Sequence, residues 1–198
     1  MFTGIIQKTG EIKKIGTRNG IKILAIEPRL AKTRAKQRML NPGDSIAVDG
    51  CCLTVTACTK KLFKVEAIPE TLKHTIINKY RKGTIVNLEN PLKIGDSLDG
   101  HFVQGHIDFV GTVLKSGKDG DSKILTISFP KNIAKYFALK GSVTVNGVSL
   151  TISKISKTGF EVSLIPQTLK TTNLNSLVKN DVANIEIDMI ARYINAHK

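Results

Sequence analysis

An internal repeat constrains the fold of this chain more than any other feature of its sequence. The phrase VDGCCLTV at 48–55 returns as VNGVSLTI at 145–152, so that Gly147 follows Gly50 by 97 positions. The same spacing aligns IPETLKHT at 68–75 with IPQTLKTT at 165–172, and VNLE at 86–89 with ANIE at 183–186. Two copies of about 100 residues predict two similar domains rather than a solenoid.

Near the start of each copy the spacing changes to 101 residues. TGIIQKTGEI, beginning at Thr3, aligns with QGHIDFVGTV, beginning at Gln104, which pairs Gly4 with Gly105. The first copy therefore carries four extra residues, in the basic stretch before Asn41. We divide the chain into a first domain at 1–97, a second at 98–186 and a tail at 187–198.

Most segments of each copy have the character of β-strands. They are short, rich in β-branched residues and separated by Gly, Pro, Asn or Asp. Each copy also has one helix-like stretch, PRLAKTRAKQRML in the first and PKNIAKYFALK in the second. This composition predicts a mainly β fold, with each copy closed or nearly closed into a small barrel. In the tail, Ile187, Ile190, Tyr193 and Ile194 form an apolar helical stripe that neither repeat needs.

Strand alternation assigns the residues of the repeated phrase to two faces. Cys51, Leu53 and Val55 point one way, and Cys52 and Thr54 point the other. In the second copy the corresponding sets are Val148, Leu150 and Ile152 on one face, and Ser149 and Thr151 on the other. The first face is apolar in both copies and is predicted to be core. The second face is either the wall of a binding pocket or an ordinary solvent-facing surface.

The two Ile-Pro blocks are interpreted as turns that close a strand. Backbone groups left unpaired there, together with Thr71 or Thr168, could recognise a flat heterocycle with imide-like donors and acceptors. Turn chemistry alone also explains Pro69 and Pro166.

The stretch GHFVQGHID at 100–108 carries two of the four histidines. A metal site made of His101, His106 and Asp108 is disfavoured, because on a regular strand the two histidines would face opposite sides. A histidine that moves a proton or donates a hydrogen bond is the better interpretation. The residue aligned with His106 is Ile5, so the two domains differ chemically there.

Composition narrows the choice of partners. The net charge of +14 raises nucleic acid as a partner, but the excess is +10 in 1–97 and +4 in 98–198, and aromatic residues are only 5%. The basic stretch 32–38 has no aromatic neighbours for base stacking, so nucleic-acid binding is disfavoured. No apolar run is long enough to cross a membrane, and no signal peptide is evident. Three cysteines do not suggest a disulfide framework, so we expect a reduced, cytoplasmic protein.

Taken together, these motifs resemble the riboflavin synthase family. The resemblance rests on MFTGII, GDSIAVDGCCLTV, PETLK, DGHFVQGH, GSVTVNGVSLTI and LIPQTL with NIEIDMIARY, which occur in order over essentially the whole chain. It implies two tandem six-stranded, Greek-key-like β-barrels and a C-terminal α-helix that assembles a homotrimer. Each barrel would bind one 6,7-dimethyl-8-ribityllumazine, with the active site between barrels of two subunits. The implied reaction transfers a four-carbon unit between two lumazines, giving riboflavin and 5-amino-6-(D-ribitylamino)uracil without a cofactor or metal.

The resemblance also implies site residues. The positions associated with the chemistry or its surroundings are Ser45, Cys52, His106, Ser149 and Asp188. The substrate pocket of the first barrel would comprise Gly4, Ile5, Ile6, Cys51, Cys52, Leu53, Thr54, Glu66, Ala67, Ile68, Pro69, Glu70 and Thr71. That of the second would comprise Gly105, His106, Ile107, Lys140, Val148, Ser149, Leu150, Thr151, Ser163, Leu164, Ile165, Pro166, Gln167 and Thr168.

Two questions stay open at this level. A non-catalytic lumazine- or flavin-binding protein of the same fold is the alternative function, although all five positions associated with the chemistry are present. Association with a lumazine synthase shell, for which the positive charge would be suited, is the second open question.

Overall fold

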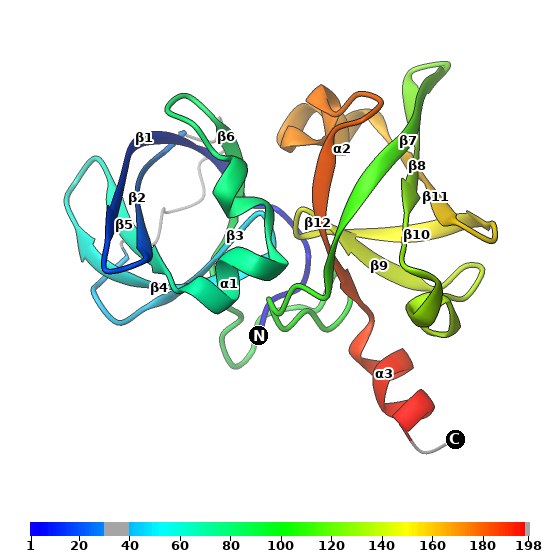
Figure 1. The fold of residues 1–198 in the computed structure, drawn as a ribbon, viewed down its shortest axis with the longest axis horizontal. Helices are drawn as coiled ribbons and strands as arrows, with labels where there is room; N and C mark the ends of the chain where they lie inside the picture. Colours follow the sequence, from blue (N-terminus) through cyan, green and yellow to red (C-terminus); the bar gives the residue numbers. More distant parts are fainter. Residues whose placement is uncertain (30–39, 197–198) are drawn as a thin grey trace.

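The computed structural model describes residues 1–29 and 40–196 and shows two closed β-barrels side by side, followed by a C-terminal helix (Figure 1). Each barrel has six antiparallel strands, and the strand order of the second repeats that of the first. The prediction of a mainly β, duplicated fold is therefore confirmed. No helix in the described part of the chain is long and apolar enough to span a bilayer.

Barrel 1 is built from the first six strands, in the order β1-β2-β5-β4-β3-β6 around the barrel. Its interior is filled by apolar side chains that alternate with outward-facing polar ones, as in Cys51–Cys58. The strands are β1 (Lys8–Arg18), β2 (Ile21–Pro28), β3 (Ser45–Val48), β4 (Cys51–Cys58), β5 (Phe63–Ala67) and β6 (Ile85–Glu89).

Barrel 2 has the equivalent arrangement around its own core. Its strands are β7 (Phe109–Asp119), β8 (Ser122–Ser128), β9 (Ser142–Val145), β10 (Val148–Ile155), β11 (Gly159–Leu164) and β12 (Val182–Ile187). This core also contains a group of phenylalanines, in which the rings of Phe129 and Phe137 stack with centroids 4.8 Å apart.

The two Ile-Pro blocks form short helices rather than turns, which corrects the sequence-based interpretation. The helices are α1 (Pro69–His74) and α2 (Pro166–Thr171), each with proline in its first turn, where no N–H is needed. Each leads into a 3₁₀ helix, η1 (Ile76–Lys79) or η3 (Asn173–Ser176), capped by the hydroxyl of the preceding threonine. Proline fixes a backbone angle that is already helical, and the residues that follow it continue the helical turn.

The two predicted helix-like stretches have different outcomes. The second forms only a 3₁₀ helix, η2 (Lys131–Tyr136), which is tighter than the expected α-helix. The first was predicted at 28–40, and residues 30–39 of it are outside the described part of the chain.

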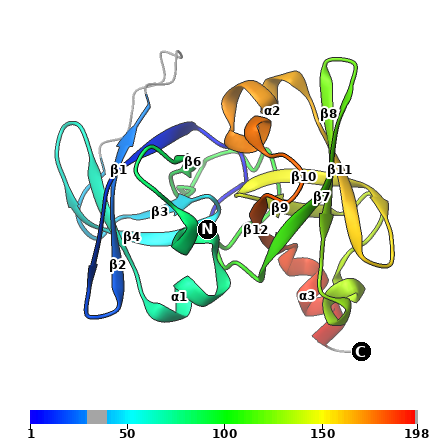
Figure 2. The ribbon, with the colours of Figure 1, turned by 45° about the horizontal axis from the view of Figure 1, so that its top comes forward.

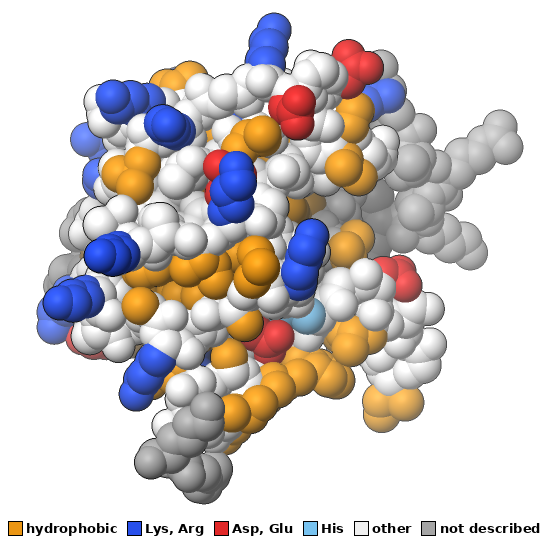
Figure 3. Space-filling model, turned by 90° about the vertical axis from the view of Figure 1, so that its right-hand side faces the viewer, with side chains coloured by type: hydrophobic (Ala, Val, Ile, Leu, Met, Phe, Trp, Pro, Cys, Tyr) orange, Lys and Arg blue, Asp and Glu red, His pale blue; other side chains and the backbone are white. Residues whose placement is uncertain are grey.

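The C-terminal helix α3 (Met189–Ala196) extends away from both barrels (Figure 1). Ile187 is not part of its apolar stripe, contrary to the prediction, but ends β12 and is 3% exposed in the barrel 2 core. The stripe thus consists of Ile190, Tyr193 and Ile194, each more than half exposed. Figure 3 shows the side of the molecule that lies at the right of Figure 1, and hydrophobic side chains gather on its lower part, around α3.

One hydrogen bond caps the start of α3, and one ion pair ties the helix to the segment before barrel 2. The Asp188 carboxylate accepts a hydrogen bond from the Ile190 N–H at 2.9 Å and so caps the first turn. Arg192 forms an ion pair with the largely buried Asp108 at 2.9 Å. The exposed apolar stripe is therefore held in a defined direction.

The barrels meet where two hairpin turns touch back to back. Both turn residues have positive φ in Asp49-Gly50 and again in Asn146-Gly147, as two-residue turns of this kind require. A Cβ on Gly50 would lie 2.7 Å from the Gly147 nitrogen, and a Cβ on Gly147 would lie 2.6 Å from the Gly50 nitrogen. The two copies are thus related by an approximate twofold axis through this contact.

Asparagine side chains tie the two turns together. Asn87 of barrel 1 donates to the Asn146 carbonyl at 2.9 Å, and Asn184 of barrel 2 donates to the Asp49 carbonyl at 2.9 Å. Asn87 and Asn184 are equivalent positions of the repeat, so the two hydrogen bonds are symmetry mates.

The segments that precede the two barrels cross at the same axis. Phe2 and Val103, again equivalent positions, exchange backbone hydrogen bonds of 2.7 and 3.1 Å and are fully buried. The N-terminus accordingly lies between the barrels in two different views (Figures 1 and 2).

We expect Gly50→Ala to destabilise the protein through this contact. Alanine at Gly83, where φ is also positive but no atom lies within 4 Å of the added Cβ, is the matched control. The control should lose about 1–2 kcal/mol through backbone strain, and Gly50→Ala roughly 1–3 kcal/mol more, because the Gly147 backbone must move. Urea unfolding of the two variants measures the difference, and equal losses would show that the contact between the turns is not close.

Candidate functional site

The outward face of β4 is the first part of the candidate site, and it matches the predicted alternation. Cys51, Leu53 and Val55 are at most 4% exposed, whereas Cys52 is partly exposed and Thr54 is exposed. Burial raises the pKa of the Cys51 thiol to about 12, so this thiol stays neutral and serves as a small apolar side chain.

The neighbouring strand extends this face, which we call the barrel 1 face and define by Cys52, Thr54, Glu66 and Ile68. Glu66 points outward from β5, and Ile68, which follows β5, is 54% exposed. Pro69, Glu70 and Thr71 continue the face as the first turn of α1. An exposed isoleucine beside polar side chains offers an apolar platform with hydrogen-bonding edges, which suits a flat polar heterocycle.

Barrel 2 presents the equivalent surface, the barrel 2 face, defined by Ser149, Thr151, Ser163 and Ile165. Val148, Leu150 and Ile152 of β10 are buried, and Ile165 is 59% exposed next to α2, which contains Pro166, Gln167 and Thr168. Ala67 and Leu164, which were also predicted site residues, are at most 1% exposed, so their side chains belong to the barrel cores.

The segments before each barrel cross over to the other barrel's face. The Cys52 N–H donates to the Gly105 carbonyl at 2.8 Å, and the Ser149 N–H donates to the Gly4 carbonyl at 2.8 Å. Ile6 packs against the barrel 2 core, and Ile107 packs against the barrel 1 core.

This crossing corrects the predicted grouping of the pocket residues. Gly4, Ile5 and Ile6 were expected beside Cys52, and Gly105, His106 and Ile107 beside Ser149, because each set precedes its own barrel in the sequence. The structure exchanges the two sets because the segments pass through the pairing of Phe2 with Val103 before reaching the opposite barrel.

Glycine is required where each crossing segment meets the opposite face. Gly4 and Gly105 have φ of +77° and +83°, and a Cβ on either would lie 2.6 Å from the Cβ of Ser149 or Cys52, respectively. The absence of a side chain therefore allows the backbone carbonyl to approach the strand.

Two buried glutamates anchor the crossing segments. The Glu89 carboxylate accepts hydrogen bonds from the Thr3 N–H and hydroxyl, both at 2.7 Å, and from the Gly4 N–H at 3.1 Å. Glu186, the equivalent residue, accepts from the Gln104 and Gly105 N–H groups at 2.7 and 2.9 Å. Burial raises the pKa of both carboxyl groups, that of Glu186 to about 7. The sequence reasoning missed both, although their recurrence in VNLE and ANIE is a signal.

A histidine that was not among the predicted site residues contacts the barrel 2 face. Nδ1 of His101 lies 2.7 Å from the Ser149 hydroxyl oxygen. His101 and His106 do not lie on the regular strand that the alternation requires, because the backbone of 99–108 is irregular apart from a single bridge at Val103. His106 is exposed and lies next to Gly105, and therefore beside the barrel 1 face.

Three predicted residues remain to be placed: Ser45, Lys140 and Asp188. Ser45 begins β3, pairs with Thr54 and is partly exposed, so it extends the barrel 1 face. Lys140 is exposed before β9, and its N–H donates to the Ile152 carbonyl at 3.0 Å. Asp188, besides capping α3, lies near His101: burial lowers the pKa of this ring, and the negative charge of Asp188 opposes that lowering. The five residues that the family resemblance predicts for the chemistry are therefore divided between the faces rather than collected in one.

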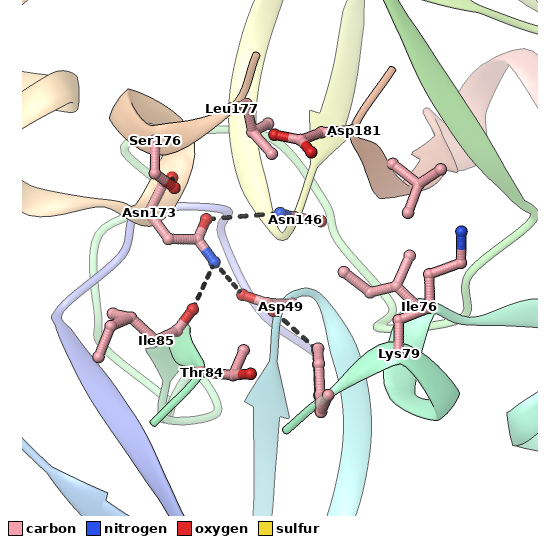
Figure 4. A pocket seen from close by; sticks show the side chains of 12 residues that line it. Asp49, Ile76, Lys79, Thr84, Ile85, Asn146, Asn173, Ser176, Leu177 and Asp181 are labelled. Carbon is pink, nitrogen blue, oxygen red and sulfur yellow. Dashed lines mark hydrogen bonds between the residues drawn. The ribbon is translucent and has the colours of Figure 1, made fainter. Parts of the chain in front are cut away.

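The structure also contains a pocket of about 300 Å³ on the approximate twofold axis, distinct from both faces (Figure 4). Its floor is Asp49, whose carboxylate accepts from the Tyr80 hydroxyl at 2.7 Å, the Asn87 N–H at 2.7 Å and the Asn173 side chain at 2.8 Å. None of the predicted site residues lines it. A second hollow of about 390 Å³ lies beside Thr3 and Ile5, with Glu89, Asp96 and Asp99 among its lining residues. Among the residues that the structure describes, no three His, Cys, Asp or Glu side chains are grouped to hold a metal ion.

Comparison with known proteins agrees with this duplicated arrangement. A family model described as the lumazine binding domain matches twice, at residues 3–91 and 104–188. The riboflavin synthase of Bacillus subtilis is 38% identical over 194 residues, covering 98% of this chain and 88% of the relative. That of Brucella abortus is 37% identical over 198 residues, covering 98% of this chain and 96% of the relative.

Solved structures with the same fold contain bound ligands. LumP complexed with riboflavin superimposes with a TM-score of 0.84 at 27% identity, covering 94% of this chain and 99% of that chain. LumP complexed with 6,7-dimethyl-8-(1'-D-ribityl) lumazine gives a TM-score of 0.81 at 26% identity, with the same coverage.

The buried Asp49 makes the stability of the chain depend on pH. Burial raises the pKa of this carboxyl from 3.8 to about 7, so the folded state binds its proton more tightly than the unfolded state does. The contribution of Asp49 to the free energy of unfolding should be greatest below about pH 4, decrease as the pH rises to about 7, and then level off.

Asp49→Asn should make this decrease shallower, since asparagine already occupies the equivalent position 146 and accepts the equivalent hydrogen bond from the Asn184 N–H. Glu186 would account for part of the decrease that remains. Urea unfolding at several pH values tests the prediction, with the exposed Asp119→Asn as control. An unchanged slope in Asp49→Asn would contradict it.

Proposed function

The chain belongs to the lumazine-binding domain family, and we propose that its two barrel faces hold the two substrate molecules of riboflavin synthesis. Its activity is that of a riboflavin synthase, a transferase: one molecule of 6,7-dimethyl-8-ribityllumazine transfers a four-carbon unit to a second, giving riboflavin and 5-amino-6-(D-ribitylamino)uracil. One observation carries the assignment of the sites, namely that the duplication and the crossing segments produce two similar surfaces with different polar groups.

Each face combines residues of both repeats. On barrel 1, Cys52 and Thr54 stand beside Gly105 and His106. On barrel 2, Ser149 and Thr151 stand beside Gly4 and Ile5. The exposed Ile68 and Ile165 would support the flat rings of the lumazines, and the ends of α1 and α2 would supply backbone hydrogen bonds to the ring edges.

The reaction needs its two substrates to react differently although they are identical molecules. The faces supply that difference at Cys52 and Ser149, at His106 and Ile5, and at Asp188, whose aligned position in the first repeat is Pro91. Holding two rings in a reactive arrangement is itself a large effect, since effective molarities of about 10⁵ M or more are reached in favourable intramolecular reactions. Side-chain chemistry at Ser45, Cys52, His106, Ser149 and Asp188 would then act on positioned substrates.

A non-catalytic ligand carrier similar to LumP agrees less well with the comparisons than a riboflavin synthase does. The riboflavin synthases of Bacillus subtilis and Brucella abortus are 37–38% identical to this chain, whereas LumP is 26–27% identical. The five positions associated with the chemistry are also all occupied by the expected residues.

We further infer that the enzyme is a homotrimer, with each active site formed by the barrel 1 face of one subunit and the barrel 2 face of another. The exposed stripe on α3 supports this assembly, because three large apolar side chains on a helix that leaves its own barrels need a partner surface. The three cysteines are free, which supports a reducing, cytoplasmic location. The excess of positive charge would suit docking to an acidic lumazine synthase shell.

The basic experiment is to incubate the purified protein with the lumazine alone and follow the appearance of riboflavin. In this assay Cys51→Val should keep most of the activity, because its thiol lies in the core where the second repeat already has Val148. Cys52→Ala should reduce turnover more than it reduces stability, because this side chain faces outward beside Gly105. A larger loss of activity for Cys51→Val at unchanged stability would contradict the assignment of the two faces.

The trimer is tested by placing charge on the stripe of α3. Ile190→Glu combined with Ile194→Glu should give monomers with little activity, because the two barrel faces of an active site would no longer meet. Burying one such isoleucine contributes roughly 1.5–3 kcal/mol. Ile155→Glu, at the far end of β10, is the control. Analytical ultracentrifugation and the riboflavin assay decide together, and a fully active monomer would refute the intersubunit site.

A further inference from the structure

The inference concerns the contact between His101 and Ser149, and it rests on the function proposed above. Ser149 lies on the barrel 2 face, and its hydroxyl is within hydrogen-bonding distance of one ring nitrogen, Nδ1 of His101, at 2.7 Å. A hydroxyl rotates freely unless a partner fixes it, and it can donate one hydrogen bond while accepting two. The tautomer of the imidazole therefore decides whether the Ser149 hydroxyl donates to Nδ1 or accepts from it.

The backbone of His101 is held firmly enough to serve this purpose. Its N–H donates to the Thr3 carbonyl at 3.1 Å, and Thr3 is itself bound by the Glu89 carboxylate through two hydrogen bonds of 2.7 Å. The preceding residue must be glycine, since a Cβ on Gly100 would overlap the Thr3 carbonyl oxygen and lie 3.2 Å from the Ser149 Cβ. A carboxylate at the end of barrel 1 thus positions a ring that contacts a side chain of barrel 2.

The barrel 1 face lacks this arrangement. Cys52 occupies the position equivalent to Ser149, and in the described part of the chain no hydrogen bond joins its thiol to an imidazole. His106, the histidine nearest that face, is exposed. The imidazole contact therefore makes the two otherwise similar faces chemically unequal.

We propose that His101 is a positioning residue. Its Nδ1 accepts a hydrogen bond from the Ser149 hydroxyl, so that the lone pairs of the serine oxygen point toward the lumazine held on barrel 2. In this state the serine oxygen acts as a hydrogen-bond acceptor toward the substrate. Protonation of the ring reverses the arrangement: Nδ1 becomes a donor to the serine oxygen and occupies one of its lone pairs.

The surroundings favour the neutral ring at neutral pH. Burial lowers the pKa of His101 below its ordinary value of 6.5, and the negative charge of Asp188, between β12 and α3, opposes this lowering. Glu89 is occupied by Thr3 and Gly4 rather than by the ring, and Asp99 lies two positions before His101 in the chain. The acceptor state of Ser149 should consequently be lost on the acid side of neutrality.

The test compares two substitutions by the pH dependence of kcat and by KM. His101→Asn places a carbonyl oxygen close to the position of Nδ1, where it can accept the serine proton but does not titrate. It should keep kcat within a few-fold of wild type at neutral pH and lose the decrease that wild type shows in acid. His101→Leu removes the acceptor and should lower kcat about 10- to 100-fold with little change in KM, the size expected when a reacting group is misplaced. Asp119→Asn, an exposed carboxylate at the end of β7 and outside both faces, is the control and should leave the profile unchanged.

A second measurement does not depend on turnover. The His101 ring is titrated by NMR in the wild-type protein and in Ser149→Ala, and loss of the hydroxyl should shift its pKa and change its tautomer. Absence of riboflavin in the wild-type assay would refute the proposed function, and the NMR comparison would then decide the contact alone. The inference is overturned if the ring titrates identically in both proteins, if His101→Leu keeps the wild-type kcat, or if His101→Asn keeps the acid decrease.

Discussion

The close contact of two glycine turns is the constraint on which the rest of this structure depends. Gly50 and Gly147 approach so closely that neither can carry a side chain, and asparagines of the two barrels bridge the turns around them. Each barrel is closed and has its own core, so nothing within a barrel determines where the other one lies. The contact between the turns supplies that information and relates the copies by an approximate twofold axis.

Around that axis, each of the two barrel faces is made of residues from both copies of the repeat. Because the segments ahead of the barrels pair at Phe2 and Val103, each reaches the barrel of the other copy, where a buried glutamate and a glycine hold it. The faces inherit their likeness from the repeat and their difference from single positions such as Cys52 and Ser149. A reaction between two identical molecules in different roles is served by this combination.

Several features followed directly from residue patterns. Alternation along 51–55 and 148–152 assigned core and surface correctly, because side chains of a strand alternate strictly and one face of each strand is packed. Local patterns were less informative at the ends of elements. The Ile-Pro blocks became short helices instead of turns, because proline fixes a helical backbone angle. Ile187 joined β12 instead of the final helix, because it pairs with Val143 and is buried in barrel 2.

The sequence by itself determined the duplication, the β-barrel class, the inward and outward faces of the strands and the family, because these depend on local periodicity and on order along the chain. Only the tertiary structure decided that Gly4 serves barrel 2 and Gly105 serves barrel 1, that Glu89 and Glu186 hold these segments, and that His101 contacts Ser149. The residues in these contacts are between 48 positions apart, for His101 with Ser149, and 145 positions apart, for Gly4 with Ser149. No periodicity encodes such distances, and they are set by the crossing of two segments at a shared axis.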